Sequence, residues 1–147
     1  MDKKYNLNDL ALMTGFTTRT LRNYLNQGIL NGEKTNGMWQ FSAEEIDRFF
    51  REPFVKEGLR IKRSSAVYDF MADRNKKQER SCIILDIPAS AKEGNDISKF
   101  FCDKMNDVED VIFSYLWDNG ICRVILSGAA DSVANIIKAY YVTKCND

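Results

Sequence analysis

The feature that most constrains the fold is a turn of three residues between two short amphipathic segments near the start of the chain. Asn6 or Asn8 can cap the first segment, whose apolar residues recur at helical spacing as far as Gly15. Thr17 can cap a second helix, predicted over residues 18–27. Only the three residues Gly15-Phe16-Thr17 connect the two predicted helices, and a turn this short is found in few helix-helix motifs.

The segment that follows predicts a β-hairpin and a third helix. Asn36-Gly37 lies between short apolar stretches, and a type I′ turn needs positive φ at both central positions. Ser42 and Glu45 have the spacing of a capping box, which opens a further helix. Helix, short turn, helix, hairpin and helix is the order of a winged helix-turn-helix, and we predict this fold for residues 1–52.

The second helix and the hairpin resemble a known family. Residues 20–30, Thr-Leu-Arg-Asn-Tyr-Leu-Asn-Gln-Gly-Ile-Leu, are similar to the signature of the MerR-type winged helix-turn-helix and its excisionase-like relatives. Gly37 and Phe41 resemble the glycine and the aromatic residue of the family's wing. The resemblance covers about residues 5–50 and implies binding to duplex DNA. The chain departs from the pattern at Trp39, which replaces a wing arginine that usually meets the DNA backbone.

A recognition helix places its N-terminal residues against base edges in the major groove. Arg19 and Asn23 are the candidates for base contacts, because arginine pairs with guanine and asparagine with adenine. Arg22 and Tyr24 are expected at phosphates, and for Trp39 both core packing and DNA contact are open. The predicted DNA-contacting set is Thr18, Arg19, Arg22, Asn23, Tyr24, Lys34 and Trp39.

Three more positive charges follow within four residues, at Arg60, Lys62 and Arg63. Such a cluster either adds phosphate contacts and a steeper salt dependence or forms a solvated helix face. Pro53 suits the first turn of the helix that carries them, which is predicted to run to about Gln78. Residues 53–80 are therefore predicted to be a connecting helix and a polar linker.

The second half of the chain predicts a separate domain over residues 81–147. Its pattern is a strand to Pro88, a helix capped by Asn95 or Asp96, strands over 111–117 and 121–127, and a last helix from Asp131. This β-α-β-β-α order matches most of a ferredoxin-like unit, and residues 141–145 are the candidate for a fourth strand. The whole chain is thus predicted to be α+β.

Two helices can cover only one face of the predicted C-terminal sheet. Alternation along the strands predicts that the aromatic side chains of residues 111–117 lie on the other, uncovered face. An apolar face of this kind indicates a subunit interface, a site for a small-molecule effector, or packing against the connecting helix. The predicted dimer or effector surface comprises Phe113, Tyr115, Trp117 and Arg123.

The distribution of charge supports a nucleic-acid-binding head. Residues 1–80 carry 15 Lys and Arg against 11 Asp and Glu, whereas residues 81–147 carry 6 against 10. A DNA-binding head on a body that does not bind DNA would produce this asymmetry, although chance variation also fits it.

The chemistry-bearing residues favour neither catalysis nor a metal. The chain has no histidine, and Cys82, Cys102, Cys122 and Cys145 contain no C-x-x-C pair, so we expect buried thiols rather than a zinc site. A glycine-rich phosphate loop and a nucleophile motif are also missing, so we expect no enzyme and no cofactor. No apolar run has the length of a membrane span, and we expect a cytoplasmic protein.

These patterns lead to one main hypothesis and two alternatives. The main one is a sequence-specific transcriptional regulator that binds duplex DNA as a homodimer. The first alternative is an excisionase-like architectural protein that bends DNA. The second is a protein-interaction module whose head has lost its affinity for DNA.

Overall fold

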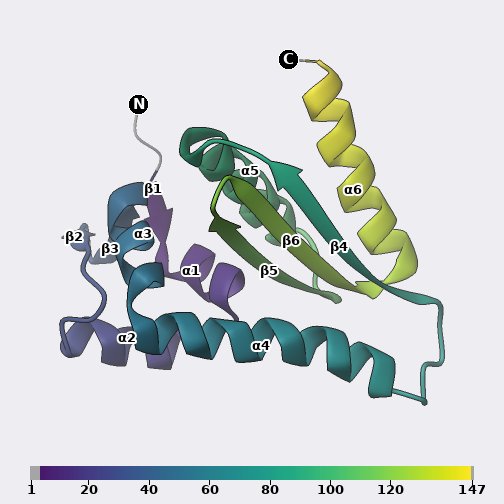
Figure 1. Cartoon of the computed structure of the whole chain (residues 1–147), viewed down its shortest axis with the longest axis horizontal. Coiled ribbons are helices and arrows are strands. Elements are labelled where there is room, and N and C mark those ends of the chain that lie inside the picture. The colour runs from purple at the N-terminus through teal and green to yellow at the C-terminus, as the bar shows by residue number, and fades with distance from the viewer. Residues whose placement is uncertain (1–3, 147) are drawn as a thin grey trace. The chain divides into compact units, whose positions relative to one another are not determined.

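The computed structural model describes residues 4–146, which form two compact units (Figure 1). Unit 1 is Met1–Lys62 and unit 2 is Arg63–Asp147. The helix α4 (Pro53–Ala72) contributes its first part to unit 1 and its last part to unit 2. No helix in the described part of the chain is both long enough and apolar enough to cross a membrane.

Unit 1 consists of two short helices, a small sheet and two further helical segments. Its elements are β1 (Lys4–Asn6), α1 (Leu7–Thr14), α2 (Thr18–Asn26), β2 (Glu33–Thr35), β3 (Met38–Ser42), α3 (Ala43–Arg51) and the start of α4. The strands are antiparallel in the order β1-β3-β2. Asn36 and Gly37 have φ angles of 53° and 79°, which confirms the predicted hairpin turn.

A single apolar core joins these elements. Side chains from α1, α2, α3 and α4 meet β1 and β3 at Tyr5, Leu10, Met13, Leu21, Phe41, Ile46, Phe49, Val55 and Leu59, all of which are buried. The sequence predicts only the two strands of the hairpin and not β1. A segment of three residues is too short to show a pattern of alternation.

Unit 2 is a three-stranded antiparallel sheet with helices. Its elements after α4 are β4 (Arg80–Pro88), α5 (Ala91–Met105), β5 (Val111–Asp118), β6 (Ile121–Ala129) and α6 (Ala130–Cys145), with the strand order β4-β6-β5. The predicted fourth strand over residues 141–145 is wrong, because α6 continues to Cys145. The predicted cap of α5 at Asn95 or Asp96 is also wrong, because Ser90 caps the helix and forms a capping box with Glu93.

The prediction of an uncovered aromatic face in unit 2 is wrong. The register places Phe113 opposite Leu126 and Tyr115 opposite Val124, so these residues share one face of the sheet. The helices pack on that face: the Phe101 ring of α5 stacks on Phe113 at 5.9 Å, and the Tyr115 hydroxyl donates to the Gly94 carbonyl at 2.7 Å. Alternation within each strand leaves open how the two strands are paired, and the pairing decides which face is buried.

The register also places Trp117 and Arg123, the other two residues of the predicted surface, on opposite faces of the sheet. Trp117 is half-buried on the helix-covered face and donates from Nε1 to the Ala89 carbonyl at 2.9 Å. Arg123 pairs with Leu116 in the strand register and therefore lies on the opposite face. The four residues do not form one surface.

Candidate nucleic-acid interface

The turn between α1 and α2 is held by hydrogen bonds at both of its ends. Gly15 has a φ of 74°, and its N–H donates to the Ala11 carbonyl at 2.8 Å. The Thr14 hydroxyl donates to the Leu10 carbonyl at 2.7 Å and accepts from the Phe16 N–H at 3.1 Å. The Thr17 hydroxyl then caps α2 by accepting from the Thr20 N–H at 3.1 Å. These bonds fix the direction in which α2 leaves the turn.

The helix α2 presents a polar face that bears most of the predicted DNA-contacting residues. Leu21 is buried, whereas Arg19, Arg22 and Asn23 are exposed and Thr18 is half-buried. Neither guanidinium forms an ion pair with another residue among 4–146. These two arginines on one exposed helix face can therefore meet phosphates or base edges without first breaking an ion pair to the described residues.

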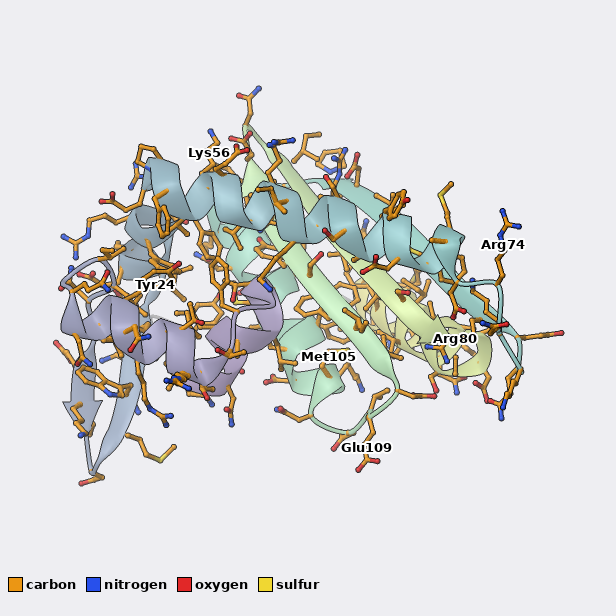
Figure 2. All side chains as sticks on the ribbon, turned by 90° about the horizontal axis from the view of Figure 1, so that it is seen from below. Tyr24, Lys56, Arg74, Arg80, Met105 and Glu109 are labelled. Atoms are coloured by element: carbon orange, nitrogen blue, oxygen red, sulfur yellow. The ribbon has the colours of Figure 1, made fainter. Side chains whose placement is uncertain are left out.

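Tyr24 lies on a different side of α2, inside an aromatic cluster of unit 1 (Figure 2). Its ring centroid is 5.8 Å from that of Phe16, 5.7 Å from Phe49 and 6.0 Å from Phe54. These contacts hold α2 against the turn, α3 and α4. The ring of Tyr24 thus positions the helix, while a phosphate contact by its hydroxyl stays a prediction.

The hairpin β2–β3, which we call the wing, brings Lys34 and Trp39 together. They are directly opposite in the strand register, and the Lys34 Nζ lies 5.7 Å from the centre of the Trp39 ring. Trp39 is half-buried and stacks on the fully buried Phe41 at 6.5 Å with an interplanar angle of 15°. Trp39 therefore extends the core towards the tip of the wing and holds the lysine beside it.

The three positive charges near the middle of α4 have three different environments. Arg60 is exposed and binds the Glu57 carboxylate at 3.1 and 2.6 Å, and this bond lowers the pKa of Glu57. Lys62 lies beside the turn of unit 1, with its Nζ 5.8 Å from the Phe16 ring. Arg63 belongs to unit 2, where it donates to the Tyr115 carbonyl at 2.5 Å, and burial lowers its pKa to about 10. The prediction of one phosphate-contacting cluster is wrong for Arg63, because its guanidinium is partly buried and donates to the β5 backbone.

Two hydroxyl groups at the start of α2 were not among the predicted site residues. The Thr17 and Thr20 hydroxyl oxygens are 3.0 Å apart, next to the exposed Arg19. Hydroxyl groups at this end of a recognition helix are common phosphate ligands. The signal in the sequence is the threonine-rich start of α2, of which the predicted DNA-contacting set includes only Thr18.

The described residues include no group of three or more histidine, cysteine or acidic side chains placed to hold a metal. All four cysteines are free thiols: Cys102 and Cys122 are buried, Cys82 is half-buried and Cys145 is exposed. The expectation of buried thiols is thus wrong for Cys145, which lies at the end of α6.

A close turn between two helices, an exposed arginine face on the second helix and a flanking wing define a helix-turn-helix DNA-binding module. Residues 5–64 match the family described as MerR HTH family regulatory protein. The N-terminal region of this chain is therefore a MerR-type helix-turn-helix, which confirms the resemblance and indicates a DNA-binding regulator. No curated protein and no solved structure matches the chain.

Proposed function

We propose that this protein is a sequence-specific transcriptional regulator that binds duplex DNA as a homodimer. The observation that carries the proposal is the exposed, unpaired pair Arg19 and Arg22 on the helix that follows a MerR-type turn. In this proposal Arg19 and Asn23 contact base edges in the major groove, and Arg22 and Lys34 contact phosphates. Thr18 and Trp39 contribute to the same surface.

The homodimer follows from how a single helix-turn-helix meets DNA. One recognition helix covers only a few base pairs, and dimers gain specificity from two half-sites about 34 Å apart. Unit 2 supplies the dimer contacts in this proposal, as a ferredoxin-like β-α-β-β-α unit without its fourth strand. The proposed location is the cytoplasm, and the proposal includes no catalytic step.

A small-molecule effector is not part of the proposal. The effector is predicted against Phe113, Tyr115 and Trp117. In the structure Phe113 and Tyr115 are buried against α5, and Trp117 is half-buried and donates from Nε1 to the Ala89 carbonyl. The family indicates regulation, but it does not by itself imply a ligand pocket at this position.

A second candidate function is that of an architectural protein that bends DNA, as in the excisionase-like relatives. The wing favours it, because Trp39 packs on Phe41 where a backbone-contacting arginine would stand in a MerR-type activator. Lys34 is then the one cation of the hairpin, residues 33–42, and its Nζ lies over the Trp39 ring. Tandem sites at the end of a mobile element would support this candidate, and a single pseudo-palindromic operator would support a transcriptional regulator.

The experiment that tests the proposal is DNA binding by arginine variants. Genome-wide footprinting of the wild-type chain would first identify a bound duplex. We expect Arg19→Ala and Arg22→Ala to weaken binding to that duplex by about 1–3 kcal/mol each. The matched control is Arg74→Ala, which removes the same charge from the segment after α4 (Figure 2).

Three results are distinguishable in this experiment. Loss of affinity in the two α2 variants but not in Arg74→Ala supports the proposed interface. An equal loss in all three indicates non-specific attraction of positive charge. An absence of duplex binding by the wild-type chain at low salt would refute the proposal and favour a protein-interaction module.

A further inference from the structure

The outer edge of β4 is open along its whole length. All nine residues of β4, Arg80–Pro88, pair with β6 on one side. In the described part of unit 2 no strand pairs with the other side, and the chain segment after β6 is helical to Cys145. An open strand edge presents unpaired backbone N–H and C=O groups, and a strand from another chain can bind to them.

The other edge strand, β5, differs from β4 in one respect. The carbonyl of Tyr115, in the middle of β5, already accepts a hydrogen bond from Arg63 at 2.5 Å. No comparable bond from a side chain to the backbone of β4 occurs in residues 4–146. Of the two edges, β4 is therefore the one whose backbone accepts no side-chain hydrogen bond from the described residues.

We propose that β4 pairs in antiparallel fashion with β4 of a second copy of this chain. The two sheets then form one six-stranded sheet with the order β5-β6-β4-β4-β6-β5 across a two-fold axis. This inference rests on the homodimer of the proposed function and names the surface that forms it.

The side chains of β4 are complementary to themselves in one register. A two-fold axis perpendicular to the sheet keeps each residue on its own face, and directly opposite residues of an antiparallel pair lie on the same face. In a symmetric β4–β4 pair, one residue must therefore lie directly opposite its own copy in the partner. When Ile83 lies opposite the partner's Ile83, Arg80 lies opposite the partner's Asp86 and Cys82 lies opposite the partner's Ile84. Because of the two-fold symmetry, each of these two pairs occurs twice. When Ile84 instead lies opposite the partner's Ile84, Asp86 lies opposite the partner's Cys82. No acidic residue of the partner then lies opposite Arg80.

The charges needed for this register are available. Arg80 is exposed at the start of β4 and forms no ion pair within the described residues (Figure 2). Asp86 accepts from Arg123 at 2.7 and 2.8 Å on the same face of the sheet. A carboxylate has about four acceptor positions, so Asp86 can bind a second guanidinium beside the first.

The apolar residues of β4 also lack cover on this side. Ile84 is 53% exposed, and on the helix-facing side Ile83 and Leu85 are only half-buried. Their neighbours on the central strand, Leu126 and Val124, are 0% exposed in the same layer. A second sheet placed against β4 would complete the layer, with Ile83 packed against the partner's Ile83.

A disulfide across the two-fold axis tests both the surface and the register. Directly opposite residues of an antiparallel pair have Cα atoms about 4.5–5.5 Å apart, which suits a disulfide. In a Cys145→Ser background, we expect Ile84→Cys to form a covalent dimer with Cys82 under mild oxidation. Adding Cys82→Ser should abolish the dimer, and Ile112→Cys on β5, which is also exposed, should not form one.

A second pair of variants separates this interface from DNA binding. We expect Arg80→Glu with Ile84→Glu to weaken dimerisation at least about tenfold in a mass measurement of the intact particle, because like charges then face each other. The folded spectrum and low-salt binding to a single half-site should be retained. Arg22→Ala should do the opposite, by keeping the dimer and losing DNA.

The inference is overturned if the wild-type chain is monomeric, or if the dimer persists in the double variant and Ile84→Cys does not cross-link. A persisting dimer would point to α4, which exposes Phe54, Ile61 and Tyr68 at intervals of seven residues. If Ile84→Cys cross-links but no duplex is bound, the proposed function fails and the β4 interface stands.

Discussion

Asn23 and Lys34 are both exposed polar residues of unit 1, but they are expected to contribute to DNA binding in different ways. An asparagine that contacts an adenine edge gives preference for one base pair, whereas a lysine at a phosphate adds affinity for every sequence. We therefore expect Asn23→Ala to reduce affinity for the best site by about 1–3 kcal/mol and to relax preference at one position. Lys34→Ala should weaken all sites equally and reduce the slope of log affinity against log salt by about 0.9.

Competition binding against a library of duplexes at several salt concentrations measures both effects. An unchanged sequence preference in Asn23→Ala would remove this residue from the base-contacting set. Glu33 is exposed on the same strand as Lys34, and its carboxylate forms an ion pair with Lys4 at 3.6 Å. As a control, Glu33→Gln should not reduce the salt slope.

Arg63 is the residue whose predicted role the structure changes most. It is half-buried, donates to the Tyr115 carbonyl, and has an Nε atom without a hydrogen-bond partner. Because a buried charge with few partners gains little, we expect Arg63→Met to leave the free energy of unfolding unchanged or to raise it by up to about 2 kcal/mol. The salt dependence of DNA binding should not change. A smaller salt slope in Arg63→Met, measured beside Lys34→Ala, would restore Arg63 as a phosphate contact.

At the scale of elements, the start of β5 lies against the end of β6 at Gly128, where a side chain would overlap the backbone. A Cβ on Gly128 would lie 2.2 Å from the Asp110 carbonyl oxygen and 2.8 Å from the Val111 Cα. Since both obstacles are backbone atoms, we expect Gly128→Ala to destabilise unit 2 by about 3 kcal/mol. The control is Gly120→Ala in the β5–β6 turn, where nothing lies within 4 Å but φ is 79°, so the cost should be about 1 kcal/mol. Equal urea midpoints for the two variants would contradict this account.

The elements that the sequence predicts correctly are those specified by local chemistry. The Thr17 cap, the Gly15 stop and the Asn36-Gly37 turn each depend on residues within a few positions. The α2 face with Arg19 and Arg22 was predictable for the same reason, because helical spacing alone separates it from Leu21.

The start of α5 shows why a local signal can be misjudged. Ser90 and Glu93 form a capping box that is present in the sequence, but the predicted helix starts only after Gly94, at Asn95 or Asp96. In the structure that glycine is required by packing, since a Cβ there would lie 2.9 Å from the Trp117 ring and 3.0 Å from the Tyr115 hydroxyl. The reason for the glycine comes from a strand about twenty residues away.

The faces of unit 2 and the positions of Tyr24 and Arg63 depend on contacts between distant segments. Strand register decides that Phe113 and Tyr115 are buried, and no residue near them specifies it. Tyr24 packs against Phe49 and Phe54, and Arg63 bonds a carbonyl 52 positions away. Sequence patterns identify such residues as amphipathic or charged, but they do not identify the partner.

At the scale of the whole molecule, chemical modification of the thiols can report the unfolding of unit 2. Burial raises the pKa of the Cys122 thiol to about 11 from an ordinary value of 9, and Cys145 is exposed. At pH 8 the thiolate fraction of Cys122 is thus about a hundredfold lower than normal, so iodoacetamide should modify Cys145 first and Cys122 only after unfolding. Because the folded pKa is the higher one, this thiol's contribution to stability is present below pH 9 and is lost as the pH rises to 11. Rapid modification of Cys122 in the native protein, measured by mass spectrometry of peptides, would contradict the buried position.

The division into two compact units predicts two separable unfolding transitions. Each unit contains one tryptophan, Trp39 in unit 1 and Trp117 in unit 2, so single-tryptophan variants report on one unit at a time. Leu21 is 0% exposed in unit 1, and Leu21→Ala should cost about 2–5 kcal/mol there. With a urea dependence of about 1–3 kcal/mol per molar, this loss should lower the Trp39 midpoint by at least about 0.7 M and leave the Trp117 midpoint unchanged. Gly128→Ala should do the reverse. If both probes instead give one coincident transition that either substitution shifts, the chain unfolds as a single cooperative body, and DNA binding by unit 1 would depend on the packing of unit 2.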